Sequence, residues 1–252
     1  MPKLAANQPP TPHYYADNLR QLLSHVQQHY ADVLSGEERQ FIDHVSNLSC
    51  DAQRLFARLL GRKGPWIRID RLSYPEVADL TAALDELEAV DLVEINGQAP
   101  ADALLGLLKQ TERQQLFPGL ECSRQRLTKH QHITQCLCRY PDALIAHRIA
   151  TEIPWVCVAR YPIVHRCQLL FFGDPYQDLT TFVLQDLGLL NYEPYALCVQ
   201  TRQFADRQAL QRYLRLLELA SLAHRVDELD GLAEAVLAEL LRQPSELTPS
   251  NP

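Results

Sequence analysis

Residues 54–74, RLFARLLGRKGPWIRIDRLSY, contain a helix, a turn and the beginning of a strand. Apolar residues recur at helical spacing in the first part of this stretch, and they are Leu55, Phe56, Leu59 and Leu60. Gly61 or Gly64 ends the helix, because glycine readily adopts the backbone conformations that close one. In PWIRID, residues 65–70, every second residue is an isoleucine, which predicts a short strand. The stretch therefore predicts a helix–turn–strand corner.

The same corner is strongly basic, although the chain as a whole is acidic. The chain carries 24 Lys and Arg against 31 Asp and Glu, whereas residues 54–74 hold six cations and the single acid Asp70. The cations are Arg54, Arg58, Arg62, Lys63, Arg68 and Arg71, and Tyr74 adds a ring whose hydroxyl can donate to a phosphate. No acid is interleaved along the helix to pair them, although like charges four residues apart repel one another. We interpret the corner as a phosphate-binding surface, with a solvated helix face as the alternative.

The residues on either side of this stretch complete a recognisable order of elements. Apolar residues at helical spacing predict helices over 14–34 and behind the expected N-cap Ser35, and Ser49 begins the basic helix. A further amphipathic helix follows over 79–90, and LVEI at 92–95 is typical of a second short strand. The order helix, helix, strand, helix, strand is the pattern of a winged-helix unit with a short β-hairpin.

The helix expected at the recognition position of this unit is acidic. Residues 76–94 contain seven Asp and Glu and no Lys or Arg. DNA repels such a helix from its major groove, because every phosphate carries a negative charge. The pattern therefore predicts contacts with the phosphate backbone through the preceding basic helix, and little reading of base sequence.

The remainder of the chain is mainly helical, which makes the predicted fold class mainly α. The predicted units are a disordered N-terminus over 1–13, the helical lead and winged-helix-like unit over 14–97, a small helical unit over 98–140, helical hairpins over 141–245, and a tail over 246–252. The small unit carries a second group of cations, Arg124, Arg126 and Lys129, which we expect beside the first in a shared groove.

The composition favours a cytoplasmic protein. Hydrophobic residues make up 46% of the chain, but no run of eighteen apolar residues predicts a membrane span. The segment that begins at Met1 lacks the apolar region of a signal peptide. The seven cysteines are odd in number and scattered, which indicates reduced thiols and no disulfide framework.

The motifs of catalytic and metal sites are absent from the sequence. Cys122, His130, His132, Cys136 and Cys138 fall close together, but their spacing does not match a zinc hairpin, and we expect no metal or cofactor. Restriction-type nucleases need an acid two residues before a lysine, to bind a metal ion and polarise water. The four lysines of this chain follow Met1, Gly61, Leu107 and Leu127 at that spacing, so no catalytic residue is predicted.

Several motifs together resemble the N-terminal half of the Fanconi-associated nuclease family. The pattern is Tyr14-Tyr15, Arg62-Lys63 at the end of the basic helix, Trp66, and the step RLSYPEV at 71–77. Farther along, ADALLGLLKQTERQQLF with RLTKHQHITQCL is similar to the SAP-type DNA-binding unit of that family. The segments 168–195 and 201–214 resemble the start of its TPR-like helical-repeat domain.

The resemblance implies a structure-selective DNA-binding region that favours branched or flap DNA. By resemblance, the DNA contacts are Arg62, Lys63 and Tyr74, together with Lys129 of the SAP-type unit. The family acts in the repair of interstrand cross-links through a C-terminal virus-type replication-repair nuclease (VRR-NUC) domain that uses Mg²⁺ or Mn²⁺. The resemblance further implies a nuclease domain in the same chain, a second copy of the protein on the DNA, and association with a bacterial nucleoid.

The sequence departs from the family because no VRR-NUC domain is present in these 252 residues. It is therefore either a fragment or a shortened relative that binds DNA without cutting it. Two other readings remain open: a nuclease with a site that lacks the usual motif, and a helical scaffold for protein interaction.

Overall fold

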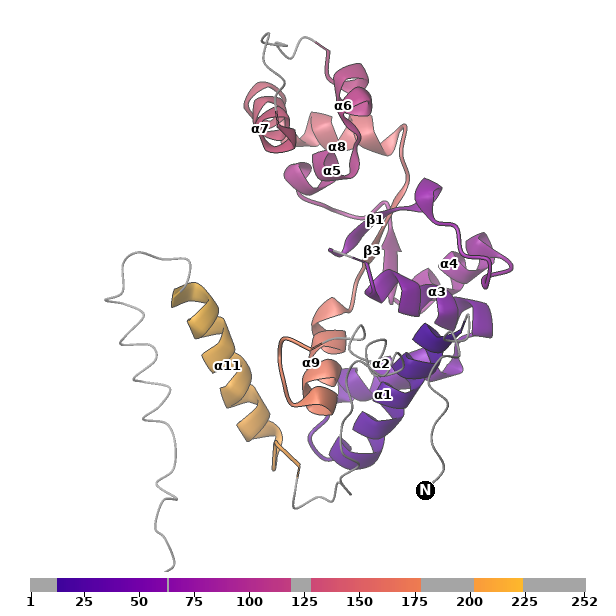
Figure 1. The fold of residues 1–252 in the computed structure, drawn as a ribbon, viewed down its shortest axis with the longest axis vertical. Helices are drawn as coiled ribbons and strands as arrows, with labels where there is room; N and C mark the ends of the chain where they lie inside the picture. The colour runs from indigo at the N-terminus through magenta and orange to yellow at the C-terminus, as the bar shows by residue number, and fades with distance from the viewer. Residues whose placement is uncertain (1–12, 63, 119–127, 178–201, 224–252) are drawn as a thin grey trace, which may run out of the picture.

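The computed structural model describes residues 13–62, 64–118, 128–177 and 202–223. Its first elements are α1 (Tyr14–Tyr30), α2 (Gly36–Asn47), α3 (Cys50–Leu60), β1 (Trp66–Arg68), the 3-10 helix η1 (Ile69–Arg71), α4 (Leu80–Ala89) and β2 (Val93–Ile95). They are followed by α5 (Ala101–Leu107), α6 (Gln110–Leu116), α7 (Lys129–Arg139), α8 (Asp142–Ala150), β3 (Trp155–Val158), α9 (Tyr161–Phe172) and α11 (Arg207–Ala223). The predicted mainly α fold class is confirmed (Figure 1).

Side-chain caps set where the first helices begin. Ser35 and Glu38 form a reciprocal capping box at the start of α2, and the Ser49 hydroxyl accepts the Ala52 N–H at the start of α3. The Asp79 carboxylate caps α4 in the same way. After α3, Gly64 adopts a φ of 88°, a left-handed conformation that favours glycine and reverses the chain into β1.

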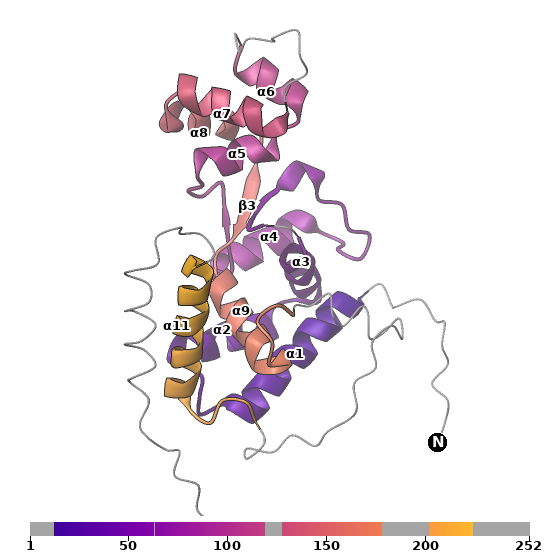
Figure 2. The same ribbon diagram turned by 60° about the vertical axis from the view of Figure 1, so that its left-hand side comes forward.

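The sheet differs from the predicted hairpin in one respect. Its order is β1–β3–β2, and both outer strands pair antiparallel with β3. Figure 2 shows β3 running between α5 and α4. Ile67 and Ile95 therefore flank Val156 from opposite sides instead of facing each other. The predicted pairing of the strand near 65–70 with the strand at 92–95 was wrong, because the apolar run WVCV at 155–158 lies between them. That run falls in a region predicted to be mainly helical.

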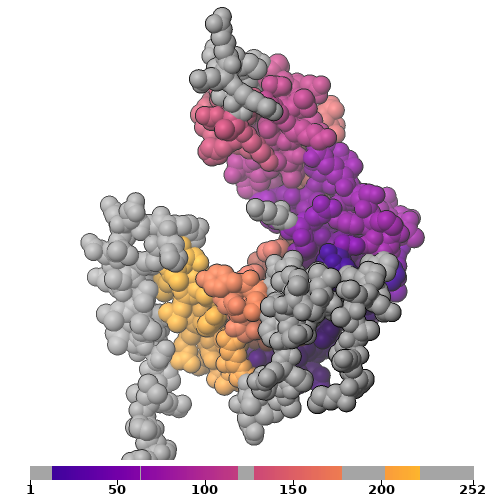
Figure 3. Space-filling view, viewed as in Figure 1, coloured from indigo at the N-terminus to yellow at the C-terminus, as the bar shows by residue number. Residues whose placement is uncertain are grey.

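Two apolar cores lie on either side of this sheet. The first joins α1 to α4 with Val156 and Val158 of β3, with α9 and with the beginning of α11. The second consists of the buried residues Ala101, Leu104, Leu105, Leu108, Phe117, Cys136, Ile145, Ile149, Ile153 and Trp155. It forms a separate lobe above the first in the space-filling view (Figure 3). The unit boundary expected after residue 140 falls inside this second core, because α8 packs against α5.

The corner between α1 and α2 holds the later helices by ion pairs. Glu38 is fully buried, and its carboxylate lies 2.5 Å from Arg166 of α9 and 2.5 Å from Arg207 of α11. Arg202, just before α11, makes a paired contact with Asp32 at 2.6 and 2.7 Å. Elements more than a hundred residues apart in sequence are therefore joined by charge as well as by apolar packing.

Candidate phosphate-binding surface

A groove of about 320 Å³ runs between the corner at 54–74 and the end of α5. It is lined by Arg62, Trp66, Ile67, Arg68, Arg71, Leu72, Gly106 and Leu107, and we call it the basic groove. Three of the predicted cations thus meet here, together with backbone from the second lobe. The turn after α3, the β1 strand and the η1 turn bring them together.

Arg62 is an exposed cation of this groove. Its Nε donates to the Tyr74 hydroxyl at 2.9 Å, and its guanidinium lies 5.5 Å from the centre of the Tyr74 ring. No carboxylate of the described residues lies within ion-pair distance of it. Its charge is therefore held in position by Tyr74 and remains available to an anion.

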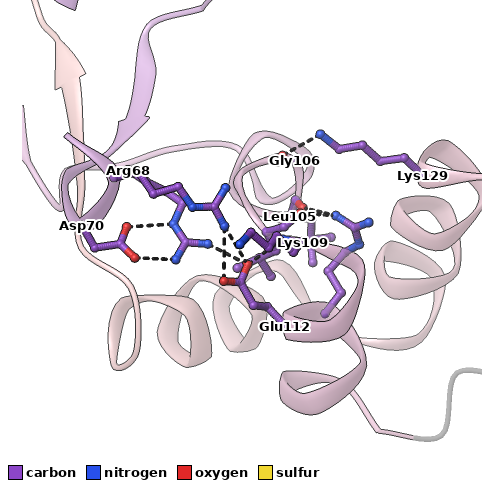
Figure 4. A network of polar contacts seen from close by, with 10 residues as sticks. Arg68, Asp70, Leu105, Gly106, Lys109, Glu112 and Lys129 are labelled. Carbon is purple, nitrogen blue, oxygen red and sulfur yellow. Dashed lines mark hydrogen bonds and ion pairs between the residues drawn. The ribbon is translucent and has the colours of Figure 1, made fainter. Parts of the chain in front are cut away.

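Arg68 is different, because two acids neutralise it (Figure 4). Asp70 accepts two of its N–H groups at 2.9 and 2.6 Å, Glu112 of α6 accepts a third at 2.6 Å, and the side chain is 7% exposed. The hydrogen bonds from Arg68 lower the pKa of Asp70, while the bonds to Asp70 and Glu112 raise the pKa of Arg68. Arg68 thus joins the two lobes and presents little charge to solvent.

Arg71 shares Glu112 with Arg68 but lies closer to solvent. Its Nη2 is 3.3 Å from both carboxylate oxygens of Glu112, and its side chain is 41% exposed. Burial alone would raise the pKa of Glu112, but the bonds from the Lys109 N–H and from Arg68 outweigh it and hold that pKa below its ordinary value.

Lys129, the member of the second basic group that the structure describes, lies beside this groove. It is the exposed first residue of α7, and its Nζ donates to the Gly106 carbonyl at 2.7 Å (Figure 4). Arg113, on the neighbouring α6, is buried and donates to the Leu105 and Leu108 carbonyls, so it stabilises the end of α5.

The remaining predicted cations have other surroundings or lie outside the described residues. Arg54 pairs with Asp51 at 3.0 Å, and Arg58 bonds Glu76 at 2.6 Å while its guanidinium lies 4.0 Å from the centre of the Tyr15 ring. Lys63, Arg124 and Arg126 lie outside the described residues. The prediction that these cations lack acidic partners was wrong for four of them. Asp51, Asp70, Glu76 and Glu112 pair with Arg54, Arg58, Arg68 and Arg71.

Arg58 is expected to contribute mainly to stability. Its partner Glu76 is 6% exposed, so Arg58→Ala leaves a carboxylate without its cation and costs about 2 kcal/mol of unfolding free energy. Urea unfolding measures this loss. Arg20→Ala, which breaks an exposed i,i+3 pair with Asp17, serves as the control and is expected to cost less than about 0.5 kcal/mol. Equal losses in the two variants would contradict the assignment.

The exposed acids of α4 and the following turn continue the acidic character predicted for this segment. Asp85, Glu88 and Asp91 are exposed, and no Lys or Arg lies on the helix. This face is unsuited to a major groove, so the basic groove is the candidate anion-binding surface among the described residues.

Sequence reasoning missed Glu112, which organises two of the arginines. No local pattern indicates it, because it lies 44 residues after Arg68 and 41 after Arg71. Glu76 could have been found from the family pattern, because the motif RLSYPEV at 71–77 contains it. That pattern is explained by packing: Tyr15, Tyr74 and Glu76 surround Arg58.

Other features of the described residues do not form a competing site. A larger hollow of about 720 Å³ lies between α8 and the linker before α5, but no Lys or Arg lines it. No three His, Cys, Asp or Glu side chains of the described ranges converge as a metal site requires. Within the same ranges, no helix combines the length and apolar character needed to cross a bilayer.

Known proteins match both the sequence and the fold. Residues 13–94 match the family model described as the FAN1 HTH domain. The chain is 32% identical over 219 residues to a Fanconi-associated nuclease 1 homolog of Pseudomonas aeruginosa, covering 85% of this chain and 39% of that protein. It is 31% identical over 229 residues to the Arabidopsis thaliana homolog, covering 85% of this chain and 25% of that protein.

Solved structures agree with these sequence matches. A crystal structure of paFAN1 bound to DNA with a 2-nucleotide 5′ flap and a gap superposes with a TM-score of 0.82 at 30% identity, covering 91% of this chain and 42% of that one. The complex with a 1-nucleotide 5′ flap gives 0.75 at 29% identity, covering 93% and 42%. The chain spans less than half the length of these relatives, and over that part it belongs to the Fanconi-associated nuclease family.

Proposed function

We propose that this chain is the structure-selective DNA-binding region of a Fanconi-associated DNA repair nuclease. The observation that carries the proposal is the basic groove. Arg62, on the Tyr74 ring, and Arg71 line it together with Gly106 of the second lobe, and Lys129 bonds the Gly106 carbonyl. Cations from separate lobes can contact phosphates on two separated parts of a DNA backbone. Plain duplex and branched DNA differ in the spacing of those phosphates, so such an arrangement responds to DNA shape.

The finer parts of the proposal rest on family resemblance. We propose that the substrates are 5′-flap and related branched DNA, the kind present in the paFAN1 complexes, and that the biological setting is the repair of interstrand cross-links at a bacterial nucleoid. The second lobe would serve as a SAP-type unit and α11 as the beginning of a TPR-like domain. A nuclease domain in the same polypeptide and a second copy on the DNA are the partners that this role requires or allows.

We also propose that the 252-residue chain binds DNA without cutting it. None of its four lysines follows an acid at the spacing that metal-dependent nucleases of the restriction type use. Incubation with a flap substrate and Mg²⁺ or Mn²⁺ should leave the DNA intact. Metal-dependent cleavage would instead show that the chain is itself a nuclease, with a site that lacks the usual motif.

Binding is tested with fluorescently labelled 5′-flap, gapped and plain duplex DNA. Each of Arg62→Ala and Lys129→Ala is expected to weaken binding to flap DNA about tenfold and to reduce the slope of log affinity against log salt by about one. Both effects follow from the loss of a single phosphate contact.

Arg215→Ala is the matched control, since Arg215 is an exposed cation of α11 away from the groove. It should change affinity by less than about twofold. Failure of the unaltered chain to bind any of the three DNA molecules at low salt would favour the scaffold reading.

A further inference from the structure

An acid at the edge of the basic groove holds its two arginines unequally. Glu112 projects from α6 towards the turn that follows β1, and its Oε2 accepts Arg68 Nη1 at 2.6 Å and the Lys109 N–H at 2.5 Å (Figure 4). Arg71 Nη2 lies 3.3 Å from both oxygens of the same carboxylate, at the long end of the hydrogen-bond range.

The two arginines therefore differ in how easily they exchange partners. Arg68 is 7% exposed and also bonds both carboxylate oxygens of Asp70, so it stays in place. Arg71 is 41% exposed, and no carboxylate of the described chain other than Glu112 lies within ion-pair distance of it. An ion pair of this exposure contributes little free energy, so an incoming anion can take Arg71 away from Glu112.

The charges in this cluster also balance. Arg68 and Arg71 supply two positive charges, and Asp70 and Glu112 supply two negative ones. A phosphate that approaches Arg71 meets the Glu112 carboxylate, which is 24% exposed and occupies the same N–H donors. The phosphate gains Arg71 only if it comes close enough to replace the carboxylate and to outweigh its repulsion.

We propose that Glu112 is a specificity-determining residue of the DNA-binding surface, competing with backbone phosphate for Arg71. The proposal rests on the proposed function. A phosphate that a flap or gap lets approach closely displaces Glu112 and gains the Arg71 contact, whereas the regular backbone of a plain duplex stays farther away and meets mainly the negative charge. Glu112 thereby weakens binding to plain duplex more than binding to branched DNA.

The first experiment measures the ratio of flap affinity to duplex affinity for Glu112→Gln, a change that keeps the shape of the side chain and removes its charge. We expect affinity for plain duplex to rise about tenfold and affinity for flap DNA to rise about twofold, so that the selectivity falls about fivefold. Asp142→Asn removes one exposed negative charge at the other hollow of the same lobe and should leave the ratio unchanged.

A second variant keeps the proposal testable if Glu112→Gln fails to fold, since Glu112 also holds Arg68. Arg71→Ala leaves the bonds among Arg68, Asp70 and Glu112 in place. It should weaken flap binding about fivefold and leave duplex binding within about twofold. A role limited to stability would move both DNA affinities together in either variant.

The two proposals fail in different ways. If the unaltered chain binds neither DNA, the proposed function is wrong. If it binds both but Glu112→Gln leaves the affinity ratio unchanged, or Arg71→Ala weakens flap and duplex equally, the role of Glu112 is overturned and the DNA-binding function stands.

Discussion

Val156→Asp is expected to leave the protein largely unfolded at room temperature. Val156 is fully buried in the central strand, with Ile67 on one side and Ile95 on the other. No cation of the described residues is paired with this position, so the new carboxylate would be buried without a partner, at a cost of several kcal/mol. That cost is comparable with the whole stability of an ordinary domain, about 5–15 kcal/mol.

Circular dichroism against temperature, together with the amide dispersion in an NMR spectrum, measures the outcome. Cys157→Ser is the matched control, because the next residue of the same strand points to the opposite face and is only partly buried. It should retain the fold with a loss of about 1 kcal/mol or less. A cooperative transition near that of the unaltered protein in Val156→Asp would contradict the central place of β3.

Glu38→Ala is expected to lower the free energy of unfolding by about 3–5 kcal/mol, the range found when one partner of a buried ion pair is removed. Its carboxylate pairs with Arg166 and Arg207, and both would lose their partner at once. The Ser35 N–H would also lose its acceptor in the capping box. Urea unfolding of the variant measures the loss, and Glu37→Ala, which breaks an exposed pair with Arg160, should cost less than about 1 kcal/mol.

The contribution of Glu38 also has a defined pH dependence. Burial alone would raise its pKa, but hydrogen bonds from Arg207, the Ser35 N–H and Arg166 outweigh burial and hold the pKa below its ordinary value. A carboxylate with a lowered pKa stabilises the fold above its unfolded pKa of about 4.3, and the stabilisation disappears as pH falls through the folded pKa. The difference in stability between the unaltered protein and Glu38→Ala should therefore shrink below about pH 4, and a constant difference would exclude the ionised triad as its source.

The first four helices could be predicted from sequence because their signals are local. Ser35, Ser49 and Asp79 cap the helices that directly follow them, and apolar spacing marks the faces that the first core buries. The strand partners could not be predicted in the same way. Residues 155–158 are a short apolar run that suits either a strand or a buried helix, and its pairing depends on residues about sixty and ninety positions earlier.

The candidate site could likewise be predicted only where its signals are local. The arginines of the basic corner are visible as a cluster in the sequence, and the family pattern selects Arg62 and Tyr74 among them. Which cations stay exposed depends on acids elsewhere in the chain, above all Glu76 and Glu112, and charge counts within a window cannot identify such partners. Arg113 is a further case, because its side chain is buried and bonds the Leu105 and Leu108 carbonyls.

The placement of β3 changes how the second lobe should be understood. The chain leaves the sheet at Asn96 and returns at Trp155, and these two residues are joined there: the Asn96 N–H donates to the Trp155 carbonyl at 2.9 Å and the Trp155 N–H donates to the Asn96 side chain at 3.0 Å. The strands β2 and β3 thus form an antiparallel ribbon, and the connection between them is the entire second lobe. We interpret that lobe as the enlarged wing of the winged helix. The three residue pairs between β2 and β3 connect it to the body, and Lys129 of the wing bonds the carbonyl of Gly106, which lines the same groove as Arg62.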